Sequence, residues 1–469
     1  MADIELKKCL SFKDVVILAF STMIGWGWVV LTGNWVIDGG VAGASVAFIL
    51  GAVLCIFVGI IYCELTPMLP YAGGELVFSY KALGYDASWF TGWMITFAYL
   101  GVAAWEGPAL ATAIDYLIPI PRIGYLFTIA DFDIYISWLL IPAVVGTILI
   151  FINFKGINVS AGFQAVVTGI LALGGIIFSG VGIVRGNVQN FHPLFTDTKG
   201  FFSVVLAVPA MFVGFDVIPQ ITEEMKISLK KIPLAIISSI CLAAVWYIII
   251  ILAASIAVPR EILAEDGISV ANVLVYELGS PIAGKLIILT AVMGILTSWN
   301  GFITGATRVL YSMGRARMLP SIFGKIHPKY RTPYIAIAFV GFLTIISPVL
   351  GKNSLSWFVD ASAFGTVISY FMVSLSFIIL RNRYPNDARP YKVKGGNVMG
   401  YIAVVISLFF IALYLPTGVS SLKREEWIIV LGWIALGFLQ YVMLWKNRRN
   451  CKEEREEAIY HKRNNKSEF

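Results

Sequence analysis

Two glycines, Gly25 and Gly27, lie in the middle of the first long apolar stretch of the chain, within residues 21–28. Each glycine weakens a helix by about 1 kcal/mol. Backbone N–H and C=O groups that lose their partners in lipid cost several kcal/mol more. A helix in an apolar environment therefore keeps such a break only where protein, water or a ligand satisfies the freed groups. We interpret this break as part of a ligand site.

A second apolar stretch contains a similar interruption. Residues 209–216 combine a proline, a glycine and the carboxylate of Asp216. The two interrupted stretches hold corresponding positions if five apolar segments are repeated, and paired interruptions point to a midplane site in membrane proteins with inverted repeats. The alternative is that each glycine only allows close helix packing. Two interruptions that lie five segments apart favour the site.

One further carboxylate lies deep inside an apolar stretch. Glu106 stands between Trp105 and Gly107, and an ionisable residue at membrane depth points to a functional role. Glu106 could bind an ammonium group, carry a proton or pair with a structural partner. For Asp216, which follows the second break, we favour a capping or gating hydrogen bond near a helix end.

The composition indicates that these residues are held by a membrane protein. Of 469 residues, 58% are hydrophobic and 13% are charged, with a mean hydropathy of +0.82, whereas about a quarter of the residues of a soluble domain are charged. The first apolar run is too long for a cleavable signal peptide and has no small-residue cleavage site. The net charge of +7 is spread over short loops. This pattern sets membrane orientation and argues against a nucleic-acid partner.

Twelve apolar segments are close to the roughly twenty residues that span a bilayer. They predict an all-α polytopic membrane protein with twelve transmembrane helices, and the even number places both termini on one side. The segments are residues 14–37, 41–65, 87–117, 134–154, 158–184, 201–223, 232–258, 282–313, 333–351, 355–380, 398–417 and 426–446.

Lysines and arginines decide which side holds the termini. They precede the first segment and follow the sixth, eighth, tenth and twelfth, all of which lie on one face, and this face is therefore expected to be cytoplasmic. We therefore expect a multi-pass protein of the cell membrane in which residues 1–13 form a cytoplasmic N-terminus. Residues 447–469 become a cytoplasmic tail, which its charged composition predicts to be solvated and partly disordered.

Four groups of residues together resemble the amino acid–polyamine–organocation (APC) transporters. The motif at residues 23–27 is similar to the family's first-helix glycine motif, and residues 212–233 resemble its sixth helix and the following loop. The family has tyrosines after the paired glycines of its re-entrant loop, where this chain has Glu75. The remaining matches are Glu64, Pro70, Gly73 and Gly74, and then Asn300, Gly301, Arg308, Tyr311, Met313, Gly314, Leu319, Pro320, His327, Thr332 and Pro333.

The resemblance implies a leucine-transporter-like fold. Residues 14–184 would form the first five-helix repeat and residues 201–380 the second, inverted repeat, with helices 1 and 6 broken. Residues 398–446 would supply two additional C-terminal helices.

Two broken helices side by side would present complementary groups to a ligand. The second half of a broken helix exposes N–H groups and a positive dipole end that suit a carboxylate, and the first half exposes carbonyls that suit an ammonium group. Together they complement an α-amino acid. By the resemblance, the Gly25 motif holds the carboxylate through the N–H groups of Trp26 and Gly27. The amino group would meet the carbonyls of Met23, Ala210 and Val213, and the side chain would meet Phe215 and Phe302, for which ordinary packing is the alternative.

A coupling ion is a further expectation. Some APC members carry a lysine in the fifth segment in place of a sodium ion, but this chain has Leu171 there. The resemblance to sodium-coupled proteins of this fold implies a sodium site whose neutral oxygens suit a hard monovalent cation. Hydroxyls bonded back to their own helix are the alternative, and proton coupling or exchange stays open. The five implied ligands are the carbonyls of Ser21, Ile24 and Gly294 and the hydroxyls of Thr297 and Ser298.

The expected function is secondary active transport of an amino acid by alternating access, coupled to a cation. An amine or polyamine carrier is the closest alternative, because Glu106 suits such a substrate. An amino acid exchanger, and a channel or substrate-sensing receptor on the same fold, are further alternatives. An enzyme and a bound cofactor are not expected, because no nucleotide loop or metal-ligand spacing is present. Residues 118–133 contain no cysteine, so no disulfide-linked partner subunit is expected.

Overall fold

The computed structural model describes residues 5–264, 268–418, 421–445 and 452–460. Its helices are α1 (Phe12–Met23), α2 (Gly27–Val30), α3 (Thr32–Met68), α4 (Glu75–Leu83), α5 (Tyr85–Leu117), α6 (Ile136–Lys155), α7 (Ile157–Arg185), α8 (Thr198–Met211), α9 (Val217–Gln220), α10 (Ile232–Ala257), α11 (Arg260–Leu263), α12 (Ser269–Leu278), α13 (Pro281–Arg315), α14 (Tyr334–Ile346), α15 (Gly351–Arg383), α16 (Asn397–Tyr414), α17 (Arg424–Met443) and α19 (Lys452–Tyr460). Short 3-10 turns cover Val188–Phe191, Thr222–Glu224, Leu229–Lys231, Ser321–Gly324 and Ser347–Leu350. Two strands, β1 (Tyr125–Ile129) and β2 (Phe132–Tyr135), form an antiparallel hairpin, which the all-α prediction missed.

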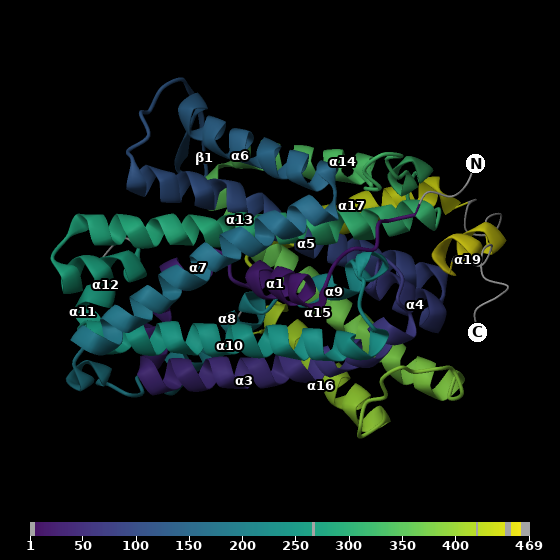
Figure 1. Cartoon of the computed structure of the whole chain (residues 1–469), viewed down its shortest axis with the longest axis horizontal. Coiled ribbons are helices and arrows are strands. Elements are labelled where there is room, and N and C mark those ends of the chain that lie inside the picture. The colour runs from purple at the N-terminus through teal and green to yellow at the C-terminus, as the bar shows by residue number, and fades with distance from the viewer. Residues whose placement is uncertain (1–4, 265–267, 419–420, 446–451, 461–469) are drawn as a thin grey trace.

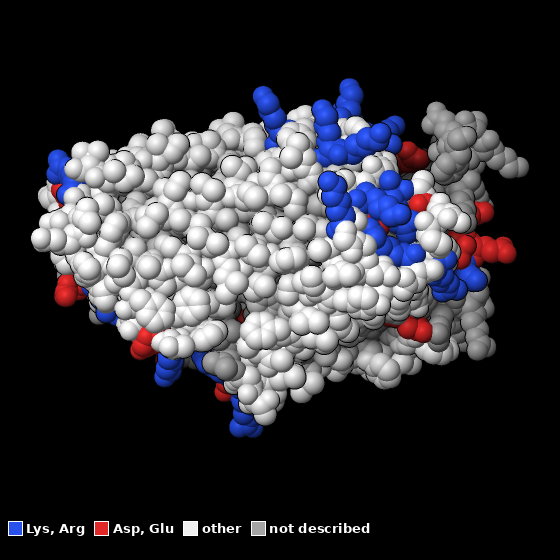
Figure 2. All heavy atoms as spheres, turned by 90° about the horizontal axis from the view of Figure 1, so that it is seen from below, with Lys and Arg blue, Asp and Glu red and all other residues white. Residues whose placement is uncertain are grey.

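Nine helices in the described part of the chain are long and apolar enough to cross a bilayer. This agrees with a polytopic, mainly helical membrane protein. Two of the twelve predicted segments, 14–37 and 201–223, are not among the nine because each is divided into shorter helices. A third, 87–117, forms the 33-residue helix α5, which is long enough but is not among the nine either. Figure 2 shows a broad surface of uncharged residues along the middle of the molecule, as a bilayer requires.

Both predicted interruptions coincide with ends of helices. Helix α1 ends at Met23 and α2 begins at Gly27, while α8 ends at Met211 and α9 begins at Val217. Gly214 has a φ of +139°, which a residue with a side chain rarely adopts. A Cβ atom at Gly214 would lie 3.0 Å from the backbone nitrogen of Met23. The non-helical segment between α8 and α9 therefore touches the end of α1, where the first break begins.

A third glycine marks the turn between the first two predicted segments. Within α3, Gly40 has a φ of +71° and separates two helical parts, close to the predicted boundary between 14–37 and 41–65. A Cβ atom at Gly40 would lie 2.7 Å from the carbonyl oxygen of Leu194. A side chain here would therefore meet both backbone strain and a collision.

Helix α13 crosses the centre of the bundle and packs against α5, α7 and α1. On either side of it, α3 packs against α10 and α8, and α15 against α5 and α16. Figure 1 shows α1 and α9 in the middle of this arrangement, with α3 and α10 running along one side. The helix breaks are thus enclosed on all sides by long helices.

One end of the molecule holds both the segment that leads into α1 and the helix α19 (Figure 1); we call it the termini end, and the other, which carries the β1–β2 hairpin, the hairpin end. Lysines and arginines gather at the termini end in Figure 2. Two buried ion pairs hold the segment after α9 to α13. Arg308 Nε lies 2.9 Å from Glu224 Oε2, and Arg315 Nη2 lies 2.7 Å from Glu223 Oε1. Leu10 pairs in parallel with Met225 beside them.

The C-terminal tail differs from its prediction. Residues 452–460 form the helix α19, which packs on the protein. Arg455 is only 1% exposed and donates from Nε to the carbonyl oxygen of Ala316 at 2.9 Å. Ile459 is buried, and the ring of Tyr460 lies 5.4 Å from that of Tyr71. Composition failed here because a few apolar and aromatic side chains are enough to dock a short charged helix. The rest of the predicted tail lies outside the described residues.

Candidate functional site

A cavity of about 760 Å³ lies where the two helix breaks meet. Its walls come from the α1–α2 break, the end of α8, and the helices α5, α10, α13 and α15. It extends toward the hairpin end, where Asp115, Lys352 and the exposed Asp360 line it. The bundle thus encloses a chamber that is large enough for a small organic molecule.

Most of the predicted substrate residues line this cavity. Phe215 is the exception. The predicted residues on its wall are Met23, Gly25, Trp26, Gly27, Glu106, Ala210, Val213 and Phe302, together with Ser298 from the predicted ion site.

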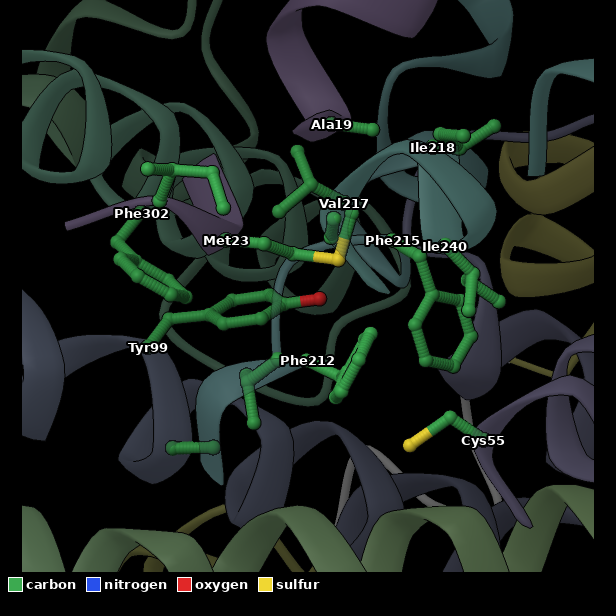
Figure 3. Packing of buried hydrophobic residues seen from close by; sticks show 14 of the residues in the cluster. Ala19, Met23, Cys55, Tyr99, Phe212, Phe215, Val217, Ile218, Ile240 and Phe302 are labelled. Atoms are coloured by element: carbon green, nitrogen blue, oxygen red, sulfur yellow. The ribbon is translucent and has the colours of Figure 1, made fainter. Parts of the chain in front are cut away.

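Phe215 does not line the cavity. Its side chain is fully buried, and its ring centroid lies 5.5 Å from that of Tyr62 and 5.6 Å from that of Tyr370. Figure 3 shows Phe215 on the far side of Met23 and Phe212 from Phe302. The structure therefore corresponds to the packing alternative for Phe215, whereas Phe302 borders the cavity.

Glu106 is a buried carboxylate on the cavity wall. Its side chain is 2% exposed, and Oε2 has no hydrogen-bond partner among the described residues. The side chain of Ser298 is a hydrogen-bond partner of the carboxylate. A Cβ atom at Gly25 would lie 3.2 Å from Glu106 Oε1 and 3.1 Å from Ser298 Oγ. The absence of a side chain at Gly25 therefore lets the carboxylate and the hydroxyl approach the helix break.

Tyr247 of α10 contributes a contact that the sequence interpretation missed. Its hydroxyl donates to the carbonyl oxygen of Met23 at 2.9 Å, one of the carbonyls assigned to an amino group. Tyr247 also lines the cavity. The available signal was a phenol inside the otherwise apolar run of residues 242–254.

The predicted ion ligands lie where α13 contacts the break between α1 and α2. A Cβ atom at Gly294 would lie 3.0 Å from the carbonyl oxygen of Ile24, so α13 and the break are in close contact. The hydroxyl of Thr297 donates to the carbonyl oxygen of Gly294 at 2.9 Å, which is the own-helix alternative. Thr297 is fully buried, and Ser298 reaches the cavity. Neutral oxygens of this kind suit a monovalent cation. The hydroxyl of Thr297 is already hydrogen-bonded to Gly294 O.

Behind these ligands lies a buried chain of amides that was also missed. Gln164 of α7 donates from Nε2 to Ser21 Oγ at 2.7 Å and to the Thr297 carbonyl oxygen at 3.0 Å. Asn300 Nδ2 donates to Gln164 Oε1 at 2.6 Å, and Asn153 Nδ2 to Asn300 Oδ1 at 2.7 Å. The chain ties α6, α7, α13 and α1 together and orients the first half of the broken helix.

Comparison with known proteins identifies the family of the chain. A family model described as amino acid permease matches residues 10–436. The chain is 26% identical to the branched-chain amino acid permease BcaP of Bacillus subtilis over 94% of this chain and 93% of that protein. It is also 26% identical to the methylthioribose transporter of the same organism, over 94% of both chains, and to the mouse cationic amino acid transporter 4, over 80% of this chain and 60% of that protein. The family model covers most of the sequence, and the chain therefore belongs to the amino acid permease family of the APC superfamily.

Proposed function

We propose that the protein is a secondary active transporter that carries an amino acid across the cell membrane by alternating access. The observation that carries this proposal is the meeting of two helix breaks at one enclosed cavity. The break at Gly25–Gly27 offers N–H groups at the start of α2, and the end of α8 offers carbonyls. Paired donors and acceptors of this kind match the two charged groups of an α-amino acid.

The topology belongs to the same proposal. We take residues 14–184 and 201–380 as two inverted five-helix repeats of a twelve-helix protein, with 398–446 as two additional helices. Both termini then lie in the cytoplasm, which the concentration of Lys and Arg at the termini end supports (Figure 2). The cavity extends toward the hairpin end, and buried ion pairs close the termini end. The structure then corresponds to a state that faces outward.

Each group of the amino acid has its own partner on the cavity wall. The N–H groups of Trp26 and Gly27 bind the carboxylate, and the carbonyls of Ala210 and Val213 bind the amino group. Tyr247 already donates to the carbonyl of Met23, so that this carbonyl binds with its second lone pair. Phe302 borders the side chain of the substrate.

Coupling to sodium is the second part of the proposal. The five oxygens of Ser21, Ile24, Gly294, Thr297 and Ser298 form the ion site, supported by the close contact of Gly294 with the carbonyl of Ile24. To coordinate an ion, Gly294 O would use the lone pair that the hydroxyl of Thr297 leaves open. The ion and the substrate would then share the broken helix.

An amine carrier is the second candidate, and Glu106 favours it. A buried carboxylate with an unpartnered oxygen on the cavity wall suits an ammonium group. The relatives named above include permeases, a methylthioribose transporter and a cationic amino acid transporter, so these names describe carriers rather than enzymes, and their substrates differ widely.

Purified protein in detergent provides the test. Thermal unfolding is followed with L-leucine, L-serine, L-arginine, putrescine or methylthioribose, each with and without sodium. A compound that binds the folded state raises the unfolding temperature by mass action. Stabilisation by an amino acid, followed by its uptake into proteoliposomes, supports the proposal. Stabilisation by putrescine alone supports the amine carrier.

With Glu106 also facing the amino group of the substrate, Glu106→Gln is expected to lower the apparent affinity for an amino acid by about 10- to 100-fold, because a charge-assisted hydrogen bond becomes a neutral one. The shape of the side chain is retained, so expression is unchanged. Tracer uptake at a series of substrate concentrations measures the effect.

Asp115→Asn is the matched control, since Asp115 lines the same cavity but is already paired with Arg122 at 2.8 Å. Unchanged affinity in Glu106→Gln, or an equal loss in both variants, contradicts a direct role for Glu106.

Replacing Thr297 and Ser298 together with alanine is expected to raise the sodium concentration needed for half-maximal uptake about tenfold or more, since two of the five proposed ligands are removed. Substrate and sodium should also tighten each other's binding by one common factor in the wild type. Sodium titrations with and without substrate measure both quantities.

Thr290→Ala removes a hydroxyl of the same helix that bonds to Ile287 O at 2.7 Å, and it should leave the sodium response unchanged. Equal uptake by the wild type in sodium, potassium and choline buffers eliminates the sodium site.

A further inference from the structure

A buried polar cluster lies outside the cavity, on the side of the two breaks that faces the termini end. Its carboxylates are Asp216, directly before α9, and Glu75, at the start of α4. Around them lie the phenols of Tyr62, Tyr99 and Tyr370 and the amide of Gln220, and all six residues are buried. Five helices and one helix break therefore contribute to a polar site within an apolar core.

In each carboxylate, one oxygen accepts a hydrogen bond and the other does not. Asp216 Oδ1 accepts a hydrogen bond from the backbone nitrogen of Gly214 at 2.8 Å, and Glu75 Oε2 accepts one from the side-chain amide of Gln220. Asp216 Oδ2, Glu75 Oε1 and the hydroxyls of the three tyrosines form no hydrogen bond of good geometry among the described residues, although the hydroxyls of Tyr62 and Tyr99 lie close to the carboxylates. Unpartnered polar atoms at full burial are costly, so their concentration at one point indicates a ligand.

The charges of the cluster are not balanced by a basic residue. Asp216 and Glu75 act electrostatically on each other, and each of the tyrosines interacts with both of them. Cys55 is the other titratable group that faces Asp216. Within the described part of the chain, no lysine or arginine is among the groups that act on either carboxylate. Two buried carboxylates that lie close together cannot both stay ionised without a cation, and the simplest cation is a proton.

The two carboxylates also connect α4 with the broken helix that continues into α9. A Cβ atom at Gly74, next to Glu75, would lie 3.2 Å from Gln220 Nε2, so α4 rests directly on α9. Asp216 holds the N–H group of Gly214, the residue that follows Val213 on the cavity wall. The cluster therefore bridges α4 and the broken helix at the closed end of the protein.

The cluster is also in contact with the cavity floor. The ring of Tyr99 lies 5.9 Å from that of Phe302, which lines the cavity. Figure 3 shows the two rings side by side, with the Tyr99 hydroxyl directed away from Phe302. Substrate that presses on Phe302 or Val213 would therefore act on the surroundings of Asp216.

We propose that Asp216 and Glu75 together bind one proton, and that this proton is coupled to transport. The proposal rests on the proposed transport function and adds a second coupled cation to it. In the closed state, one carboxyl group carries the proton and the other is ionised. When the termini end opens, the O–H bond breaks, the proton passes to water of that compartment, and both carboxylates become charged. The two negative charges repel each other across α4 and α9 until a proton returns.

Proteoliposomes separate coupling from substrate binding. Two assays with radiolabelled L-leucine, L-serine or L-arginine are compared: exchange with the same amino acid on both sides, and accumulation driven by an interior more alkaline than the outside. The wild type should perform both. Glu75→Gln and Asp216→Asn should each continue exchange but lose accumulation driven by the pH gradient, because the fixed amide binds no proton. Continued exchange also shows that the variants are folded.

Glu106→Gln provides further discrimination, because Glu106 lies on the cavity wall and is not part of the cluster. Accumulation that follows the pH gradient in Glu75→Gln and Asp216→Asn overturns the proposal. So does loss of this accumulation, with exchange retained, in Glu106→Gln alone.

Infrared spectroscopy tests the proton without any substrate. Purified wild type at neutral pH should show the absorption of one protonated carboxyl group that the double variant Glu75→Gln/Asp216→Asn lacks. Identical spectra overturn the proton site even if transport is observed. A spectral difference without exchange of any amino acid supports the bound proton and contradicts the proposed substrate and the coupling.

Discussion

Gly27→Leu is expected to abolish substrate binding and uptake while the protein stays folded in detergent. Gly27 lines the cavity at the first residue of α2, where a leucine side chain would occupy the place of the substrate carboxylate. A Cβ atom there would lie 3.0 Å from Met211 Sδ, a flexible side-chain end that can move aside. The fold therefore tolerates the substitution, while the proposed site does not. Tracer uptake, together with thermal unfolding in the presence of the ligand, measures the loss.

Gly169→Leu is the matched control for this experiment. Gly169 is an exposed helical glycine of α7, and a Cβ atom there would meet nothing within 4 Å. The same change of residue type should leave uptake at the wild-type level. Wild-type uptake by Gly27→Leu would remove the helix break from the substrate site.

Glu224→Leu is expected to lower the free energy of unfolding by about 3–5 kcal/mol, because it leaves the guanidinium of Arg308 buried without its anion. Both side chains of this pair are fully buried, and the guanidinium contacts both carboxylate oxygens at 2.9 Å. Unfolding by denaturant in detergent, followed by intrinsic tryptophan fluorescence, measures the change.

The double variant Glu224→Leu/Arg308→Met completes the experiment. It replaces both charges with apolar groups, and this should restore most of the lost stability. If the double variant is as unstable as the sum of the two single variants, the pair does not act as a unit.

The helix breaks could be predicted because their cause is local. Gly25, Gly27 and Gly214 weaken the helices in which they lie, and the structure ends its helices at these positions. The composition alone predicted that the protein spans a membrane. The position of Glu106 on the cavity wall could be anticipated because a carboxylate inside an apolar helix requires a polar environment.

The partners of these residues could not be predicted. Tyr247 and Met23 are separated by 224 residues, and Gln164 and Ser21 by 143, so that only the packed fold brings them together. Phe215 and Phe302 look alike in sequence, yet only Phe302 reaches the cavity. The direction of Phe215 depends on a non-helical segment, in which no periodic pattern assigns side chains to a face.

The docking of α19 also has a consequence for how the protein is made. Arg455 stacks 4.4 Å over the ring of Tyr85, and Tyr460 lies against Tyr71 and Tyr80. Tyr71, Tyr80 and Tyr85 are synthesised before α19, which follows the membrane-spanning helices along the described chain. Since domains assemble in the order of translation, the bundle is inserted before this cover exists. A chain that ends before Lys452 would therefore span the bilayer and yet lack this cover.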